Sequence, residues 1–287
     1  MIDTSGTRYK IEKVSDYCWV FNGWENFLNE CGLTEFKSFM ELTGTIVDKN
    51  RRSMVYQIDL GKKKRRFYLK IHRDYIKKNL RTSFKAVPQT LLELKNLMHY
   101  ARIGMDVLEP VAWGFHPSPK GGDSFLLVEQ LHGYRSLQEW LEEEENLNEA
   151  MQREISEALA VMAAKIHTHD LAHVDLFSWH VFLKKDQGSF TAIPIDLERT
   201  KIKGKWPLVS SVKIARKQAS DLAALHLTIP WPQVGAWQRL RWYVRYCQLT
   251  GAHHDRKKYL KKILSIARKR GVQKKFKKFG VSKSFLP

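Results

Sequence analysis

The chain has 287 residues, and 43% of them are hydrophobic, which supplies a core for one large domain or two lobes and excludes a disordered protein. Lys and Arg number 49 against 30 Asp and Glu, so the net charge is +19. This excess of positive charge predicts an anionic partner: nucleic acid, an anionic membrane surface, an acidic protein or a phosphorylated substrate.

The chain begins MIDTSGTRYK, without the apolar core of a signal peptide, and we find no run of about 18 apolar residues that would predict a spanning helix. Three cysteines are scattered without CxxC spacing: Cys18, Cys31 and Cys247. This pattern argues against a disulfide framework and against a zinc site, and it fits a cytoplasmic protein.

The positive charge is concentrated in two stretches, Gly61 to Arg81 and Arg256 to Lys283, and the second contains no acidic residue. Each stretch alone is as well explained by a solvated surface. Together they favour an anionic partner, because repulsion on this scale opposes compactness unless something negative compensates.

The first half of the chain predicts a sheet with one helix. Between residues 39 and 71, GTIVD, SMVYQIDL and RFYLKIH alternate as strands, separated by polar turns, so an antiparallel meander is expected. The segment PQTLLELKNLMHYARIG predicts a helix opened by Pro88 and closed by Gly104. VLEPVAWGF and DSFLLVEQL predict two further strands, the second ending near Glu129.

The second half predicts mainly helix. Residues 136–171 have a helical pattern almost throughout, VFLKK and FTAIPIDL predict two short strands, and the chain from Ser220 onward is mostly helical. We expect an α+β, two-lobed protein-kinase-like fold, with an N-lobe over residues 1–131 and a C-lobe over residues 132–287.

The segment LAHVDLFSWHVFLKK, residues 171–185, resembles a phosphoryl-transfer catalytic loop. Asp175, between a helix end and an apolar strand, has no obvious packing role and would orient the acceptor hydroxyl. Asp196, after the next apolar strand, would hold magnesium as the aspartate of a DFG-type motif does. Lys70 would bind the α- and β-phosphates of ATP, and Glu93 on the following helix would pair with that lysine.

Glu129 and Leu131, at the end of an apolar strand, would meet the adenine edge. Each of these residues alone is a weak signal, since a lysine in a strand or a glutamate on an amphipathic helix is usually just exposed. Their order along the chain, each on the element type that the template requires, strengthens the interpretation.

With these motifs the chain resembles the lipopolysaccharide core kinase family, the heptose and Kdo kinases that share a protein-kinase-like fold. The resemblance runs from about Leu42 to about Thr200 and covers HVDLFSWHVFL and PIDLERT. It implies transfer of phosphate from ATP, with Mg²⁺, to a sugar hydroxyl of the inner lipopolysaccharide core, heptose or Kdo, at the cytoplasmic face of the inner membrane.

His180 stands where many kinases have asparagine, and the resemblance implies that histidine is the residue the family uses there. Magnesium prefers oxygen ligands, so His180 is expected to donate a hydrogen bond to a phosphate oxygen or to Asp175, or to bind a second metal weakly. A core histidine satisfied by the backbone is the alternative. The four histidines at 167, 169, 173 and 180 match no standard zinc spacing.

The sequence departs from protein kinases in three ways. Val174 replaces the arginine that receives a phosphorylated activation segment, only a short basic stretch separates Asp196 from Asp221, and no GxGxxG motif is present. The resemblance implies that Arg51 and Arg52, with backbone amides, cover the phosphates instead. A small or glycan acceptor is favoured over a protein.

Inner core lipopolysaccharide is anionic, so the basic surfaces would hold the enzyme at the membrane, and the tail around Phe276 and Phe279 would lie at the interface or form a solvated helix end. An acidic protein partner is a further possibility. The alternatives are a soluble small-molecule kinase of the aminoglycoside-phosphotransferase type, a pseudokinase scaffold, and a basic nucleic-acid-binding module; the last lacks a recognisable nucleic-acid motif.

Overall fold

The computed structural model describes residues 2–74, 76–77, 87–119, 121–143, 148–204, 207–229, 234–251 and 255–271. The chain forms two compact units, Met1–His132 and Gly133–Pro287. Each is described by itself.

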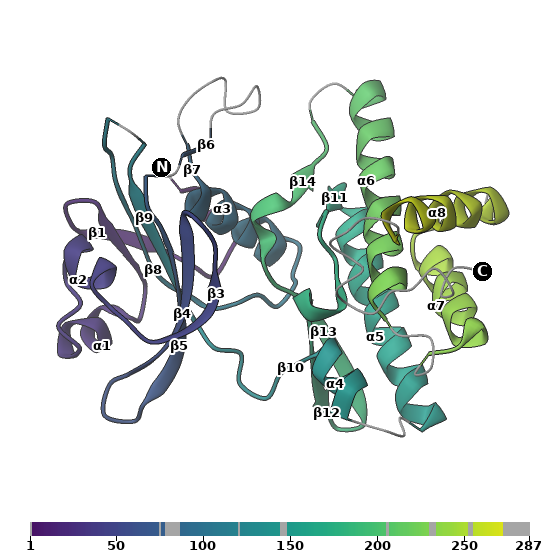
Figure 1. The fold of residues 1–287 in the computed structure, drawn as a ribbon, viewed down its shortest axis with the longest axis horizontal. Helices are drawn as coiled ribbons and strands as arrows, with labels where there is room; N and C mark the ends of the chain where they lie inside the picture. Colours follow the sequence, from purple (N-terminus) through teal and green to yellow (C-terminus); the bar gives the residue numbers. More distant parts are fainter. Residues whose placement is uncertain are drawn as a thin grey trace. The chain divides into compact units, whose positions relative to one another are not determined.

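The first unit is built on an antiparallel sheet of seven strands in the order β1-β2-β8-β9-β5-β4-β3 (Figure 1). The strands are β1 (Ile11–Ser15), β2 (Cys18–Phe21), β3 (Thr45–Lys49), β4 (Ser53–Leu60), β5 (Arg65–His72), β8 (Pro110–His116) and β9 (Asp123–Glu129). A separate two-stranded ribbon joins β6 (Ile76–Lys77) and β7 (Val87–Pro88).

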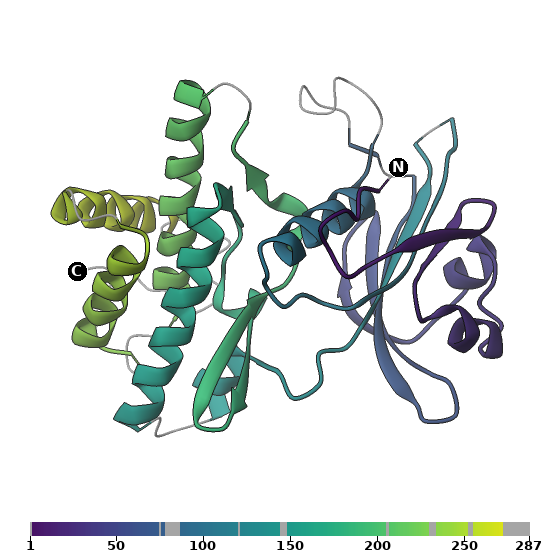
Figure 2. The same cartoon turned by 180° about the vertical axis from the view of Figure 1, so that it is seen from behind.

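Helices cover both faces of this sheet (Figures 1 and 2). One face carries α1 (Glu25–Glu30) and α2 (Phe36–Met40), where the ring of Phe39 stacks on Phe125 at a centroid distance of 4.4 Å. The other face carries α3 (Gln89–Arg102). Because side chains alternate along a strand, Phe67, Leu69 and Ile71 of β5 are buried on the α1 and α2 face while Lys70 points to the α3 face.

Local sequence signals set the turns that connect these strands. The Asn50 side chain accepts hydrogen bonds from the amides of Arg52 and Ser53, at 3.1 and 3.0 Å, and so closes the β3–β4 turn. Gly104 has φ +72° directly after α3, the left-handed position that glycine adopts most easily at a helix end. The predicted opening of this helix at Pro88 and its close at Gly104 are confirmed.

The second unit is mainly helical, with short strands that carry the loops. Its helices are α4 (Leu137–Glu143), α5 (Glu149–Thr168), α6 (Pro207–Thr228), α7 (Ala236–Leu249) and α8 (Arg256–Gly271). Its strands are β10 (Arg135–Ser136), β11 (Leu171–Ala172), β12 (Val181–Asp186), β13 (Ser189–Pro194) and β14 (Lys201–Ile202). β10, β12 and β13 form one antiparallel sheet, and β11 pairs with β14.

Small residues allow the long helices of the second unit to pack closely. α5 contributes Ala160, Ala163 and Ala164 to the core cluster, and α6 contributes Ala219 and Ala223. A side chain no larger than a methyl group lets two helix backbones approach at their crossing. Asn148 caps the start of α5 by accepting a hydrogen bond from the Met151 amide at 2.9 Å.

The α+β kinase-like fold and the predicted meander are confirmed, but four details differ from expectation. Strands β1 and β2 extend the sheet, and α1 and α2 add two helices to a half expected to hold one. The region 136–171 is divided into α4, α5 and the short β11. Helix α6 begins at Pro207, not near Ser220, so most of the basic stretch after Asp196 is helical.

None of the helices in the described part of the chain is long and apolar enough to cross a membrane. The tail with Phe276 and Phe279, and most of the basic stretch from Tyr75 to Arg81, lie outside the described residues.

His226 on α6 makes the stability of the second unit depend on pH. Burial, reinforced by the charge of Arg239, lowers the pKa of His226 from 6.5 to about 4. The folded state therefore binds fewer protons than the unfolded state between these values, and stability is lost as the pH falls below 6.5. Between about pH 7.5 and about pH 5 this residue alone should remove about 2 kcal/mol of the free energy of unfolding.

Urea unfolding at both pH values, on wild type and His226→Gln, measures this loss, and the difference between the two proteins isolates the contribution of His226 from that of other histidines. An equal loss in both proteins would contradict the assignment.

Candidate functional site

Lys70 and Glu93 form a buried ion pair inside the first unit. Lys70 Nζ donates to Glu93 Oε2 at 2.7 Å, and the two side chains are 17% and 11% exposed. The strand β5 fixes the lysine and the second turn of α3 fixes the glutamate. A pair so far removed from water fixes geometry more than it adds stability, because desolvation offsets much of the attraction. The structure thus brings together two of the residues that the sequence singles out.

Glu129 and Leu131 lie where β9 ends. The Glu129 carboxylate accepts hydrogen bonds from Arg65 Nε at 2.9 Å and from Arg65 Nη2 at 2.6 Å. This bidentate pair engages the side chain, and the Glu129 amide donates to the Glu109 carbonyl at 2.9 Å. Leu131 is half-buried. The carboxylate of Glu129 is therefore occupied by a protein partner.

In the second unit, two short pairings bring the predicted loops together. β11 precedes Asp175 and β14 follows Arg199, and their register matches Leu171 with Ile202. Between them β12 and β13 form a ribbon, and the Ile195 amide donates to the His180 carbonyl at 2.9 Å. The loop that carries Asp175 and the loop that carries Asp196 therefore share one end of this ribbon.

A buried aspartate from α6 fixes the catalytic loop. Asp221 Oδ2 accepts from the His173 amide and Oδ1 from the Val174 amide, both at 2.7 Å, and the Asp221 side chain is fully buried. Val174 has φ +80°, a left-handed conformation that is strained for a β-branched residue. The carboxylate compensates for this strain by satisfying two amides that would otherwise be buried without acceptors.

Asp221 is held in turn by a hydrogen-bonded chain. His167 Nε2 lies 3.3 Å from Asp221 Oδ2, and His167 Nδ1 lies 2.8 Å from the Tyr246 hydroxyl. A carboxylate only accepts, so the proton of His167 is on Nε2 and the Tyr246 hydroxyl donates to Nδ1. Burial raises the pKa of Tyr246, which keeps this hydroxyl protonated.

His173, the histidine of the H-x-D motif, is neutral and structural. It is fully buried, its Nε2 lies 2.9 Å from the Ile195 carbonyl, and burial lowers its pKa. A carbonyl only accepts, so Nε2 carries the proton. His173 therefore ties the catalytic loop to the residue before Asp196.

His180 is ordered by the backbone of Asp175. His180 Nδ1 lies 2.8 Å from the Asp175 carbonyl, so Nδ1 carries the proton and donates. In the neutral imidazole Nε2 then holds the lone pair, and it lies 3.7 Å from Asp196 Oδ2. The expected hydrogen bond to Asp175 exists, made to its carbonyl.

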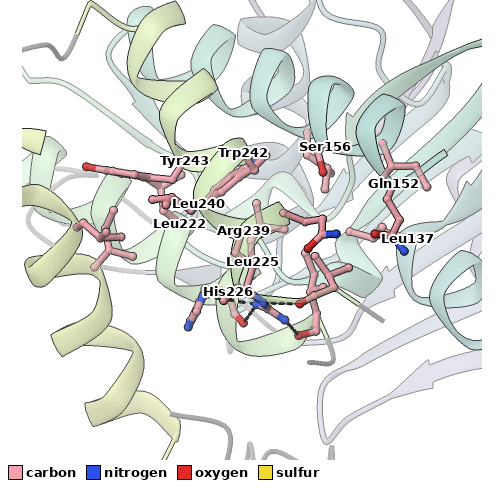
Figure 3. Close-up of a pocket in the computed structure, with 18 of the residues that line it drawn as sticks. Leu137, Gln152, Ser156, Leu222, Leu225, His226, Arg239, Leu240, Trp242 and Tyr243 are labelled. Atoms are coloured by element: carbon pink, nitrogen blue, oxygen red, sulfur yellow. Dashed lines mark hydrogen bonds between the residues drawn. The ribbon is translucent and has the colours of Figure 1, made fainter. Parts of the chain in front are cut away.

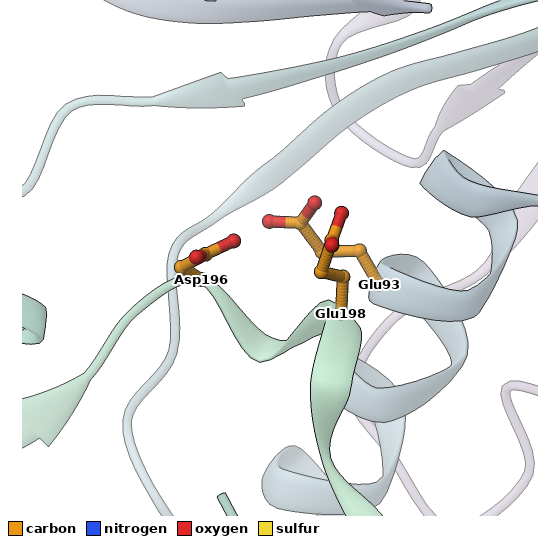
Figure 4. A group of neighbouring side chains, drawn as sticks. All are labelled: Glu93, Asp196 and Glu198. Carbon is orange, nitrogen blue, oxygen red and sulfur yellow. The ribbon is translucent and has the colours of Figure 1, made fainter. Parts of the chain in front are cut away.

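Asp196 follows β13 in a left-handed conformation, φ 57° and ψ 59°, and begins the 3-10 helix η3 (Leu197–Arg199). This turn presents Asp196 and Glu198 from one loop, and Figure 4 shows both, with Glu93 on α3. Carboxylate oxygens are the ligands that magnesium prefers, so the donor chemistry of this loop fits the predicted ion.

The catalytic candidate Asp175 carries a cationic partner that the sequence analysis did not identify. Arg199 Nη1 donates to Asp175 Oδ2 at 2.6 Å, while the Asp175 side chain is only 10% exposed. Asp221 was used in the sequence analysis only as a helix marker. Both residues lie more than 20 positions from Asp175, so neither belongs to a local pattern around the catalytic loop.

A separate apolar cavity of about 190 Å³ lies among the helices of the second unit (Figure 3). Its lining includes Leu137, Leu222, Leu225, Trp242 and Tyr243. At its polar edge Arg239 donates to the carbonyls of His226 and Ile229, at 2.8 and 2.6 Å. None of the predicted site residues lines this cavity.

The fold and the paired aspartate loops define a protein-kinase-like phosphotransferase. A solved structure titled "WaaP in complex with acyl carrier protein" is similar in fold, with a TM-score of 0.62 and 22% sequence identity over 85% of this chain and 96% of the other. The sequence model of the lipopolysaccharide kinase (Kdo/WaaP) family matches residues 37–243, and the chain belongs to this family. No curated protein matches the chain.

Proposed function

We propose that this protein is an ATP-dependent kinase that phosphorylates a sugar hydroxyl, heptose in preference to Kdo, in the inner core of lipopolysaccharide. The observation that carries the proposal is the Asp175 loop of a family member: a half-enclosed carboxylate on a loop fixed by Asp221 and joined through His180 to Asp196. Phosphoryl transfer needs positioned charges more than covalent chemistry, and this loop supplies them.

Each predicted site residue receives a role in this proposal. Lys70, held by Glu93, binds the α- and β-phosphates of ATP. The backbone around Glu129 and Leu131 meets the adenine, because the Glu129 carboxylate is engaged by Arg65. Asp196 holds Mg²⁺, which when bound neutralises charge on the β- and γ-phosphates.

Asp175 orients the acceptor hydroxyl. As the acceptor oxygen forms its bond to the γ-phosphorus and the bond to the bridging oxygen of ADP breaks, the hydroxyl proton passes to the Asp175 carboxylate.

Replacing Asp175 by Asn tests the proposal. Wild type with ATP and Mg²⁺ should add one phosphate to unphosphorylated, deacylated inner core, seen by mass spectrometry of the glycan. Asp175→Asn keeps the shape of the side chain but cannot take the proton, so we expect the rate to fall by about 100-fold or more while ATP binding is retained.

The outcome separates the alternatives. Transfer to an aminoglycoside but not to inner core would favour the soluble small-molecule kinase. ATP binding without transfer to deacylated or intact lipopolysaccharide would indicate a pseudokinase, and absence of both ATP binding and transfer would overturn the catalytic interpretation and leave a basic binding protein.

For His180 we propose metal binding together with Asp196. Its Nδ1 proton is committed to the Asp175 carbonyl, which aims the lone pair of Nε2 away from that bond and orients it as hydrogen bonds orient metal-bound histidines. Two ligands bound to one cation at about 2.1 Å are at most about 4.2 Å apart, and Nε2 and Asp196 Oδ2 are 3.7 Å apart.

Substitution of His180 should therefore change the metal requirement. We expect His180→Ala to raise the Mg²⁺ concentration for half-maximal rate by about 10-fold or more, and His180→Asn, which supplies an oxygen ligand, to raise it less. The matched control is His169→Ala, an exposed histidine that bonds the Lys165 carbonyl. An unchanged Mg²⁺ requirement with lowered thermal stability would leave His180 a purely structural residue.

We propose further that the outer helices of the second unit bind an anionic membrane surface. In α8 the exposed side chains include five lysines and one arginine: Lys257, Lys258, Lys261, Lys262, Lys269 and Arg268. Trp237 on α7 is 80% exposed, and Leu240 one turn later is 41% exposed. Tyr243 joins the two helices by donating to the Arg256 carbonyl at 2.8 Å. Cations beside an exposed tryptophan are typical of interfacial binding.

Vesicle sedimentation measures this binding. We expect the protein to bind phosphatidylglycerol-containing vesicles but not phosphatidylcholine alone, and Lys257→Gln/Lys261→Gln to weaken binding by about 10-fold or more. The control, Lys62→Gln/Lys63→Gln, makes the same charge change on exposed residues of the first unit.

Equal effects of the two double variants would contradict a specific face. The similar structure titled with an acyl carrier protein makes an acidic protein the competing occupant of this face, and displacement of the vesicles by an acidic carrier protein would favour that partner.

A further inference from the structure

Arg199 places a cation on the carboxylate assigned to orient the acceptor. The Arg199 Nη1 to Asp175 Oδ2 distance is 2.6 Å, so this is a charge-assisted hydrogen bond of short length. The Arg199 side chain is 51% exposed and the Asp175 side chain 10% exposed. A ligand that reaches Asp175 from solvent must therefore pass the guanidinium.

The position of Arg199 is set by its own loop. η3 ends at Arg199, the Leu197 side chain is buried beneath it, and the Thr200 amide donates to the Leu197 carbonyl at 3.1 Å. In contrast, the four residues that follow Asp175, Leu-Phe-Ser-Trp, carry no charge. The cation at Asp175 thus comes from the loop that also carries Asp196, 24 positions further along the chain.

A second cation lies within electrostatic range of Asp175. Arg270 near the end of α8 donates to the Ser220 carbonyl at 3.0 Å. Burial lowers the pKa of Arg270, and the negative charges of Asp221 and Asp175 oppose this shift. Asp221 is already satisfied by two amides and His167, so the field around Asp175 is weighted toward positive charge.

The guanidinium has more donors than Asp175 uses. Arginine carries five N–H donors in a planar fork that matches the two oxygens of a carboxylate or phosphate, and the Asp175 contact uses one of them. Asp175 Oδ1 is left for the acceptor hydroxyl while Arg199 holds Oδ2. An oxyanion beside the reacting hydroxyl could then meet the other donors of Arg199 without breaking the bond to Asp175.

We propose that Arg199 is the residue that selects an anionic acceptor: it binds a carboxylate or phosphate next to the reacting hydroxyl and holds Asp175 toward that hydroxyl. This inference rests on the proposed sugar kinase activity. A neutral acceptor would cover the guanidinium without replacing its water, which costs binding energy and disfavours that acceptor.

The test compares acceptors that differ only in charge. The first is a deacylated heptose–Kdo oligosaccharide without phosphate, the second is its carboxyl methyl ester, and the third carries the backbone phosphates with the carboxylates esterified. Wild type, Arg199→Met and Arg199→Lys are compared with Arg245→Met, which removes an exposed arginine bonded to Glu157 in the same unit.

We expect Arg199→Met to lower kcat/KM for the anionic oligosaccharide by about 10- to 100-fold and for the neutral ester by no more than about 3-fold, with KM for ATP unchanged. Arg199→Lys should recover part of the loss, because it keeps the charge but not the fork. Arg245→Met should behave as wild type. The first and third acceptors tell whether carboxylate or phosphate is the group recognised.

Equal losses for anionic and neutral acceptors would overturn the inference, because Arg199 would then act only through Asp175. Calorimetric binding of the same oligosaccharides without nucleotide keeps the inference testable if no acceptor is phosphorylated. Tighter binding of the anionic form that Arg199→Met abolishes would support Arg199 even if the kinase proposal failed, and equal binding by both proteins would reject it.

Discussion

The geometry of the second unit depends on one buried carboxylate. Asp221 satisfies the amides of His173 and Val174, and Val174 has a positive φ that a β-branched residue adopts only under constraint. Without this acceptor two buried amides would lack partners, and the loop would relax toward ordinary backbone angles. Asp175, His180 and Asp196 depend on that loop, because His173 bonds the Ile195 carbonyl and His180 bonds the Asp175 carbonyl.

The first unit contains a comparable constraint with a different purpose. Lys70 and Glu93 are both largely withdrawn from water and lie 2.7 Å apart, so removal of either leaves a charge without compensation. Such a pair contributes little net stability, yet it fixes the position of an ammonium group. The retention of a costly pair on β5 and α3, in a sheet otherwise built from apolar and aromatic contacts, fits a role in binding phosphates.

The sequence predicted those features that follow from local pattern. Strand alternation places Lys70 on the face opposite Phe67, and Pro88 and Gly104 bound the helix of Glu93. Features that depend on tertiary packing could not be predicted so. Arg199 and Asp221 act on Asp175 and its loop from distant elements, and α1 and α2 are short helices defined mainly by their packing on β5 and β9. The early start of α6 was missed because its first turns are polar and basic.

The positive charge of the chain can serve two electrostatic tasks that act over different distances. Exposed lysines of α8 interact with a surface through solvent, so their effect is long in range, weak for each residue and screened by salt. Arg199 acts at contact distance on one carboxylate and can discriminate between acceptors only there. An enzyme that works on an anionic polymer needs both, since long-range attraction raises the local concentration of every anion, whereas only a short, directional contact selects the correct one.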